Sequence, residues 1–336
     1  MVGSFNTSNL GGIIINYIAA LVVSFLVVYV LIPPLRKFAY KIDFVDKPVK
    51  NNDRKIHKQS IPLTAGIAIF IGFVIAYLFF VKPDDVKEYV AILIGGSLIL
   101  SIGLVDDWMK TQGKELSALP KLIVQVAAAV IVFYSGISFT GFTAPFSDEY
   151  IQFPVWLQLI FTVVWIFGVT TVINFSDGID GLAGSLTSIS STTLFIVAAA
   201  KGQTSSAIIA IILIGVSLAY LRYNKPPAKV FMGDAGATFL GFMLGVVALD
   251  GALKQATTLS LFIPILALGV PIFDNIFVVI KRFINGIPVY KADASQAHYR
   301  LLRTGLNTKQ VVFVLSLINI CFGLFSIIIL LLQNQI

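Results

Sequence analysis

The chain has 336 residues, of which 57% are hydrophobic and 12% are charged. A soluble domain has roughly twice that charged fraction, so the composition excludes an ordinary soluble protein and favours one with many membrane spans. The net charge of +7 favours anionic lipids or phosphorylated substrates as partners, and the dispersal of the basic residues among short loops argues against nucleic-acid binding.

Ten apolar segments follow one another along the chain, most of them close to the 20 or so residues that a helix needs to cross a bilayer. We expect an all-α, single-domain membrane protein over residues 1–336, with boundaries good to a few residues. Gly241 and Gly245 form a GxxxG pair in the eighth segment, which predicts close helix packing there. The expected spans are approximately 12–34, 62–81, 89–105, 119–137, 155–173, 183–200, 206–222, 236–253, 258–280 and 310–332.

The loops between these spans carry the orientation signal. Of the 24 basic residues, 20 lie in or at the edges of loops 35–61, 106–121, 174–184, 222–235 and 281–309. The remaining four, Lys82, Lys87, Lys201 and Lys254, belong to the alternate set of loops. Since Lys and Arg stay on the cytoplasmic side, the sequence predicts a multi-pass protein of the cell membrane with both termini extracytoplasmic and the five basic loops in the cytoplasm.

Carboxylates gather at the same predicted face. Asp106 and Asp107 follow the third span, and a divalent cation or a lysine would relieve their mutual repulsion. Lys110 and Lys114 stand at helical spacing to do so. A solvated helix end is the alternative interpretation of this pair.

The stretch Asn174-Phe-Ser-Asp177-Gly-Ile-Asp180-Gly-Leu-Ala-Gly184 is the most informative motif. Three-residue spacing would place both acids on one face of a helix, and the glycines would let backbone amides approach a ligand. The stretch contains no basic residue, so the two acids need an external cation. Mg²⁺ prefers carboxylates together with substrate phosphates, with Mn²⁺ as a substitute. A plain turn that caps a helix is the alternative.

Two further loops hold candidate ligands for an anion. Asp234 sits where the eighth span begins, next to glycines and after Lys225 and Lys229, which suits an anion-plus-metal site or a simple helix cap. In the last loop, His298, Arg300 and Arg303 are candidates for hydrogen bonds to phosphates or a base. Arg54, His57 and Lys58 add charge to the first loop, where topology alone predicts it.

Taken together, these motifs resemble the polyprenyl-phosphate N-acetylhexosamine-1-phosphate transferases, to which the phospho-N-acetylmuramoyl-pentapeptide transferases are a sister branch. The resemblance runs from Asp46-Lys-Pro and Arg54-Lys-Ile-His-Lys58 to Arg303, and rests most on Asn174 to Ala183 and on Phe231-Met-Gly-Asp-Ala-Gly236. It implies a UDP-N-acetylhexosamine donor, with UDP-GlcNAc favoured, a polyprenyl phosphate acceptor, Mg²⁺ and UMP as product. The implied role is the first membrane step of a cell-envelope glycan such as teichoic acid.

The resemblance also implies roles for individual residues. Asp234 would be the principal magnesium ligand, with Asp177 beside it, and the acidic pair Asp106 and Asp107 would lie near the lipid phosphate. The remaining implied residues bind substrate or act in catalysis: Asn174, Asp177 and Asp180 at the nucleotide and sugar, Asn224 and Phe231 near the nucleobase, Lys58 at the rim, and His298, Arg300 and Arg303 in the last loop.

One departure leaves the donor open. The family usually has a His-x-His-His run where this chain reads Gln296-Ala-His298-Tyr299, and Gln and Tyr carry no positive charge near neutral pH. The muramoyl-pentapeptide reaction is therefore an alternative, as is an inactive binding homologue. A transporter is a third alternative, for which Asp274 is the only deep acid. The sequence leaves a homodimer open.

Overall fold

The computed structural model describes residues 7–48, 59–82, 85–114, 116–144, 149–252, 259–286 and 294–333. Over these ranges the chain is nearly all helix, as expected, and two small antiparallel hairpins are the exception. The hairpins pair β1 (Val45–Asp46) with β2 (Ile61–Pro62), and β3 (Gly141–Thr143) with β4 (Tyr150–Gln152).

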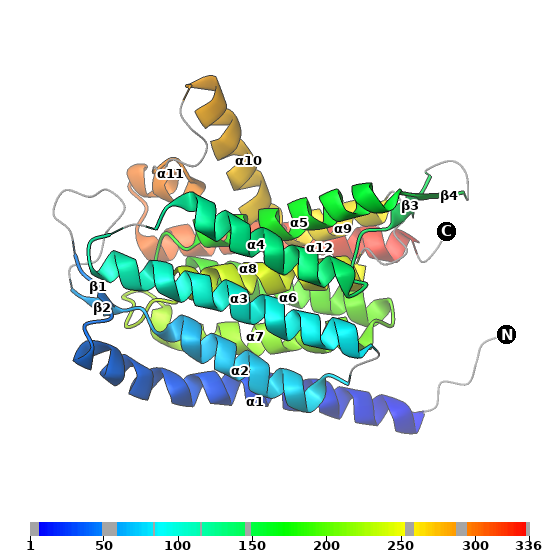
Figure 1. Ribbon diagram of the computed structural model, residues 1–336, viewed down its shortest axis with the longest axis horizontal. Helices are drawn as coiled ribbons and strands as arrows, with labels where there is room; N and C mark the ends of the chain where they lie inside the picture. Colours follow the sequence, from blue (N-terminus) through cyan, green and yellow to red (C-terminus); the bar gives the residue numbers. More distant parts are fainter. Residues whose placement is uncertain are drawn as a thin grey trace.

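The helices form one bundle (Figure 1). In chain order they are α1 (Thr7–Lys41), α2 (Ala65–Phe80), α3 (Val86–Thr111), α4 (Ala118–Tyr134), α5 (Val155–Ser176), α6 (Leu182–Ala200), α7 (Thr204–Asn224), α8 (Gly233–Val247), α9 (Phe262–Ala267), α10 (Gly269–Ile284), α11 (Ala297–Arg303) and α12 (Thr308–Gln333), with a π-helical segment η1 (Ala248–Ala252) and a 3₁₀ turn η2 (Leu259–Leu261).

Within the described ranges, seven helices are long and apolar enough to cross a membrane, and α2 and α4 are shorter apolar helices. The chain is therefore a multi-pass membrane protein, while the total of ten spans stays a prediction. The expectation of one continuous ninth helix is wrong. That segment breaks at Leu268 into α9 and α10, with Pro264 and Pro271 on either side. Asn319 of α12 accepts a hydrogen bond at 3.2 Å from the N–H of Val270 at the start of α10.

Helix α8 lies at the centre of the bundle, and 94% of an 18-residue apolar window within Gly233–Ala252 is buried. Small residues permit this. A Cβ on Gly241 would lie 2.7 Å from the Cα of Thr170 in α5, and one on Gly103 of α3 would lie 2.4 Å from the Cα of Ala235. The predicted close packing at the GxxxG pair is confirmed, since Gly245 likewise packs on Ile166.

The two ends of the bundle differ (Figure 1). The start of α1 and the end of α12 lie at one end, together with the hairpin β3–β4. The end of α3, the first hairpin and α11 lie at the other. Helix α10 leaves the bundle at an angle, and several apolar side chains in its outer part are exposed, with Phe283 81% accessible. The described parts of the predicted basic loops thus share one end, opposite the start of α1 and the end of α12.

Candidate functional site

The site begins where α3 ends against the start of α8. The first backbone N–H groups of a helix have no partner within the helix. Here Asp107 of α3 accepts hydrogen bonds from two of them, from Asp234 N at 2.9 Å and Ala235 N at 3.0 Å. Asp234 is therefore not the cap that its position in the sequence suggested, because Asp107, 127 residues earlier, caps the helix from another element.

Asp106 and Asp234 form ion pairs with the same two lysines. Lys110 Nζ lies 2.8 Å from Asp106 Oδ2 and 2.8 Å from Asp234 Oδ1. Lys121 of α4 approaches the same two carboxylates at 3.2 and 3.7 Å. Asp106 is fully buried, and its Oδ1 has no hydrogen-bond partner within the described part of the chain. Three helices therefore bring two carboxylates and two ammonium groups to one point.

Asp177 and Asp180 lie in the turn between α5 and α6. Asp177 is the C-cap of α5, and Gly181 has the positive φ of 81° that ends the turn. The expectation that the two acids share one face of a helix is thus wrong, because the chain turns between them. Burial, and then the neighbouring carboxylates of Asp234 and Asp180, raise the pKa of Asp177 to about 7. Its negative charge is incompletely compensated, which is the electrostatic setting in which a cation binds.

The loop before α8 is fastened to this turn. Asp180 Oδ2 accepts the N–H of Ala228 at 2.8 Å. Asn224, 2% exposed, accepts the N–H of Gly181 at 2.7 Å and donates to Val230 O at 2.9 Å. Asn224 therefore joins two loops, and these two hydrogen bonds occupy the amide groups that the resemblance assigned to a nucleobase.

Two other residues predicted to bind substrate remain partly exposed. Phe231 is partly exposed, and its backbone bonds to Pro62 of β2 and to Ala65 at the start of α2. Asn174 is partly exposed in the last turn of α5, three residues before Asp177.

The last loop contributes α11. Asp274 of α10 accepts the N–H of Ala297 with both oxygens, at 2.8 and 2.9 Å, and pairs with Arg300 Nη2 at 3.1 Å. The Arg300 guanidinium also lies 4.1 Å from the centroid of the Phe277 ring. Asp274, the acid that the sequence placed deep in a span, thus holds α11 in position, and this role explains its location without a transport pathway. Arg300 is engaged in this anchor, and Arg303 is exposed at the helix end.

His298 faces the turn that carries Asp177. A Cβ on Gly178 would lie 2.1 Å from His298 Nε2, so only glycine fits there. His298 is 1% exposed, its Nε2 has no hydrogen-bond partner among the described residues, and burial lowers its pKa to about 4. It is therefore neutral at physiological pH. Tyr299 and Gln296, which replace expected histidines, are also buried.

Two basic residues at this end of the bundle were not among the predicted site residues. Lys121 joins the carboxylates from α4, whereas Lys114, expected beside them, is exposed and makes none of the ion pairs found among the described residues. Arg282 is 1% exposed, with its guanidinium 5.9 Å from the ring centroid of Phe175. In each case, a basic residue within an apolar helix was the feature of the sequence that could have pointed to it. Lys58, with Arg54 and His57, lies outside the described residues.

The donor set suits a magnesium ion that also takes ligands from a substrate. Among the residues described, no group of three or more His, Cys, Asp and Glu side chains could hold a metal ion alone. Mg²⁺ is commonly held by one or two carboxylates, with substrate phosphates and water completing its shell. Asp234 and Asp177 offer such a pair. Asp106, whose Oδ1 has no hydrogen-bond partner among the described residues, shares two lysines with Asp234.

Buried acids paired with partly exposed lysines at the ends of membrane helices define a class of protein: a multi-pass membrane protein with a site for anionic groups at one edge. The comparisons identify the family. Residues 89–252, which hold all of these acids except Asp274, match the model of glycosyl transferase family 4. The chain belongs to the polyprenyl-phosphate N-acetylhexosamine-1-phosphate transferases of that family, and it is a transferase.

Three relatives indicate the range of the family. A protein of Bacillus subtilis (strain 168), named as a probable undecaprenyl-phosphate N-acetylglucosaminyl 1-phosphate transferase, is 36% identical over 94% of this chain and 85% of its own. The phospho-N-acetylmuramoyl-pentapeptide-transferase of Staphylococcus saprophyticus is 30% identical over 92% and 97%. The undecaprenyl-phosphate alpha-N-acetylglucosaminyl 1-phosphate transferase of Escherichia coli K12 is 28% identical over 84% and 75%.

Proposed function

We propose that this protein transfers N-acetylglucosamine-1-phosphate from UDP-GlcNAc to a polyprenyl phosphate such as undecaprenyl phosphate, and releases UMP. The observation that supports this proposal most strongly is the cluster of ion pairs at one end of the bundle, formed by Asp106, Asp234, Lys110 and Lys121. The 36% identical relative from B. subtilis supports the choice of donor and acceptor. The role is the first membrane step of a cell-envelope glycan, for which teichoic acid is one candidate.

The two lysines serve as the anion-binding part of the site. Phosphoryl transfer depends mainly on positioning and on neutralising charge as the leaving group departs. Lys110 and Lys121 sit where ammonium groups would contact the phosphates, with Asp106 and Asp234 holding them in place. The acceptor phosphate monoester has a second pKa near 6 and is largely dianionic at pH 7, so it needs no strong base. The monoanionic form of the acceptor keeps one proton, and Asp106, whose Oδ1 has no hydrogen-bond partner among the described residues, would accept a hydrogen bond from it and so orient it.

Magnesium is the proposed cofactor, with Mn²⁺ as a substitute. Asp234 and Asp177 would hold it, and when bound it would neutralise charge on the pyrophosphate of the donor. Asp177 must lose its proton to serve as a ligand, and its raised pKa implies that metal binding strengthens as the pH rises through 7.

The loop that carries His298 is the proposed determinant of the donor. His298 packs on Gly178, next to Asp177, and Tyr299 hydroxyl lies 3.5 Å from Gly178 O. Neutral side chains therefore stand where the wider family has a histidine run. The muramoyl-pentapeptide donor is a second candidate, because the S. saprophyticus enzyme matches over nearly its whole length.

One assay tests these proposals together. The purified full-length protein would be supplied with polyprenyl phosphate, Mg²⁺ and, in parallel, UDP-GlcNAc, UDP-GalNAc or the UDP-muramoyl-pentapeptide donor, and UMP release would be measured. We expect release with UDP-GlcNAc, and its loss with EDTA. Asp234→Asn should abolish turnover, whereas Asp43→Asn, at an exposed turn after α1, should leave it unchanged.

Other results would redirect the assignment. Release only with the muramoyl donor would assign the sister reaction. No release with any donor from folded protein would favour an inactive binding homologue. Full activity of Asp234→Asn would refute its role at the metal. Exchange of labelled UMP into the donor without acceptor would indicate a covalent intermediate, and its absence in an active preparation would indicate direct attack.

A further inference from the structure

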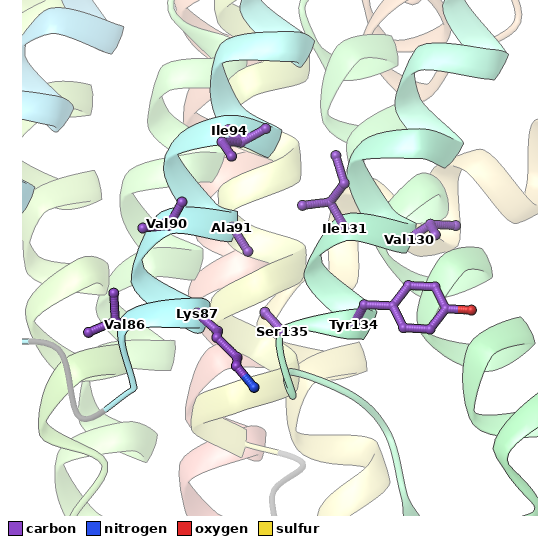
Figure 2. A pocket seen from close by; sticks show the side chains of 9 residues that line it. All are labelled: Val86, Lys87, Val90, Ala91, Ile94, Val130, Ile131, Tyr134 and Ser135. Carbon is purple, nitrogen blue, oxygen red and sulfur yellow. The ribbon is translucent and has the colours of Figure 1, made fainter.

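An apolar groove lies between α3 and α4 (Figure 2). It is at the start of α3, whereas Asp106 and Asp107 are near the end of that helix. Its walls come from Val90 and Ile94 of α3 and from Val130 and Ile131 of α4, over a floor that includes Ala91. Its volume is about 520 Å³, and it is open to the surroundings along its length. The groove is separate from the candidate active site.

The groove faces the membrane. Val90 and Ile94 are 42% and 46% exposed, on a helix that is long and apolar enough to cross a bilayer. Lys87 precedes Asp106 by 19 residues, which is about 28 Å along a helix. This nearly equals the hydrocarbon thickness of a bilayer, about 30 Å. If Asp106 marks one membrane edge, Lys87 therefore marks the opposite head-group layer.

A cation stands at the mouth of the groove. Figure 2 shows the side chain of Lys87 at the end where α3 begins, near Ser135, while the ring of Tyr134 points away from α3. Lys87 is exposed, and its ammonium makes none of the ion pairs found within the described ranges. Tyr134 is 73% exposed, a common feature of aromatic residues at a membrane interface.

Two acids of the same turn are already engaged. The side chain of Asp85 caps α3, accepting the backbone N–H of Lys87 at 2.8 Å. The carboxylate of Glu88 turns toward Gly136 and has a partner of its own. Lys201, another of the few basic residues at this end, donates to Ala252 O at 2.6 Å. Lys87 is thus a cation beside an apolar groove at head-group depth.

We infer that this groove binds one anionic glycerophospholipid of the leaflet opposite the active site, with an acyl chain between α3 and α4 and the phosphate on Lys87. The apolar walls of the groove suit an acyl chain, and the ammonium of Lys87 at its mouth attracts negative charge. This site is independent of the proposed transferase reaction, since it lies across the membrane from the carboxylates.

The test is photo-crosslinking of the full-length protein in nanodiscs. Phosphatidylglycerol and phosphatidylcholine analogues with the same diazirine-bearing acyl chain would be compared, and labelled peptides mapped by mass spectrometry. We expect labelling within residues 86–94 and 130–135, about fivefold stronger with phosphatidylglycerol. Lys87→Gln should remove that preference, and Lys82→Gln, the same charge change at the same end, should keep it. UMP release by Lys87→Gln should match that of the native chain.

A second pair of variants tests the groove itself. Val90→Trp fills it and should lower labelling by both lipids, whereas Ile123→Trp, at an exposed position of α4 outside the groove, should not. Equal labelling by the two lipids in the native chain would overturn the inference, as would loss of preference in Lys82→Gln. Displacement of the label by an equal amount of polyprenyl phosphate would also overturn it, because the groove would then hold the acceptor's tail.

Discussion

Asp106 and Asp107 are adjacent in sequence but have different partners. Both carboxylate oxygens of Asp107 accept hydrogen bonds from the first turn of α8, while Asp106 forms ion pairs with Lys110 and Lys121. Successive residues of a helix point about 100° apart, so Asp107 points to the neighbouring helix α8 and Asp106 points to the two lysines. The sequence predicts that the pair matters, but it contains nothing that separates the two roles.

This division predicts different outcomes for the two amide variants. Asp107→Asn keeps one acceptor oxygen and leaves one N–H of α8 unsatisfied, so we expect a loss of about 1–2 kcal/mol of stability. Asp106→Asn should change the thermal midpoint less, but it removes the charge shared by two lysines and should lower kcat at least about 100-fold. Thermal unfolding and UMP release of both variants check this. A larger loss of stability in Asp106→Asn would contradict the assignment.

A second prediction for a single residue concerns Gly233. Its φ of 65° is in the left-handed region, and a Cβ would lie 2.2 Å from Asp107 Oδ2. Gly233→Ala should therefore displace the cap, costing about 1–2 kcal/mol from backbone strain alone, and should lower the thermal midpoint by several degrees. Gly168→Ala in α5 is the matched control, because a Cβ there meets nothing within 4 Å. Equal midpoints for the two variants would refute this explanation.

At the scale of elements, α11 is held by buried polar contacts, and its histidine makes stability depend on pH. The pKa of His298 is about 4 in the folded chain and about 6.5 when unfolded. The unfolded chain therefore binds more protons between these values, so this contribution to stability is present above pH 6.5 and is lost as the pH falls toward 4. At pH 5 the loss amounts to about 2 kcal/mol.

The measurement compares thermal midpoints at pH 7.5 and 5.0 in the native chain and in His298→Gln, which cannot be protonated. The comparison cancels the titration of the nearby acids. We expect the native chain to lose more stability on acidification than the variant. The same loss in both proteins would mean that His298 is accessible to solvent in its folded state.

Some elements could be predicted from the sequence and others could not. Span positions follow from apolar length, and the packing of α8 follows from Gly241 and Gly245. The break at Leu268 was also visible, since Pro264, Gly269 and Pro271 interrupt the segment, but apolar length alone favoured one helix. The contacts of Asp107 with α8, Asn224 with Gly181, and Asp274 with α11 join distant parts of the chain, so no local pattern specifies them.

At the scale of the whole molecule, the carboxylate site and the lipid groove lie at opposite ends of α3, and the start of α1 and the end of α12 lie at the end opposite the carboxylates (Figure 1). A nucleotide sugar is made in the cytoplasm, so a transferase that uses one needs its site on that side. The excess of Lys and Arg in the loops at the carboxylate end predicts the same orientation. Chemistry and topology thus make one prediction about which end faces inward.

Cysteine labelling tests that orientation directly. Cys321 is the only cysteine, and it lies on α12 away from both loop sets, so Cys321→Ser gives a cysteine-free background. Into this background we would place Lys114→Cys, after α3, or Lys82→Cys, after α2; both positions are exposed. A membrane-impermeant maleimide applied to intact cells should label Lys82→Cys and spare Lys114→Cys, which should react only after the membrane is permeabilised. The reverse pattern would place the carboxylates outside the cell, away from any cytoplasmic nucleotide sugar, and would contradict both the orientation and the proposed donor.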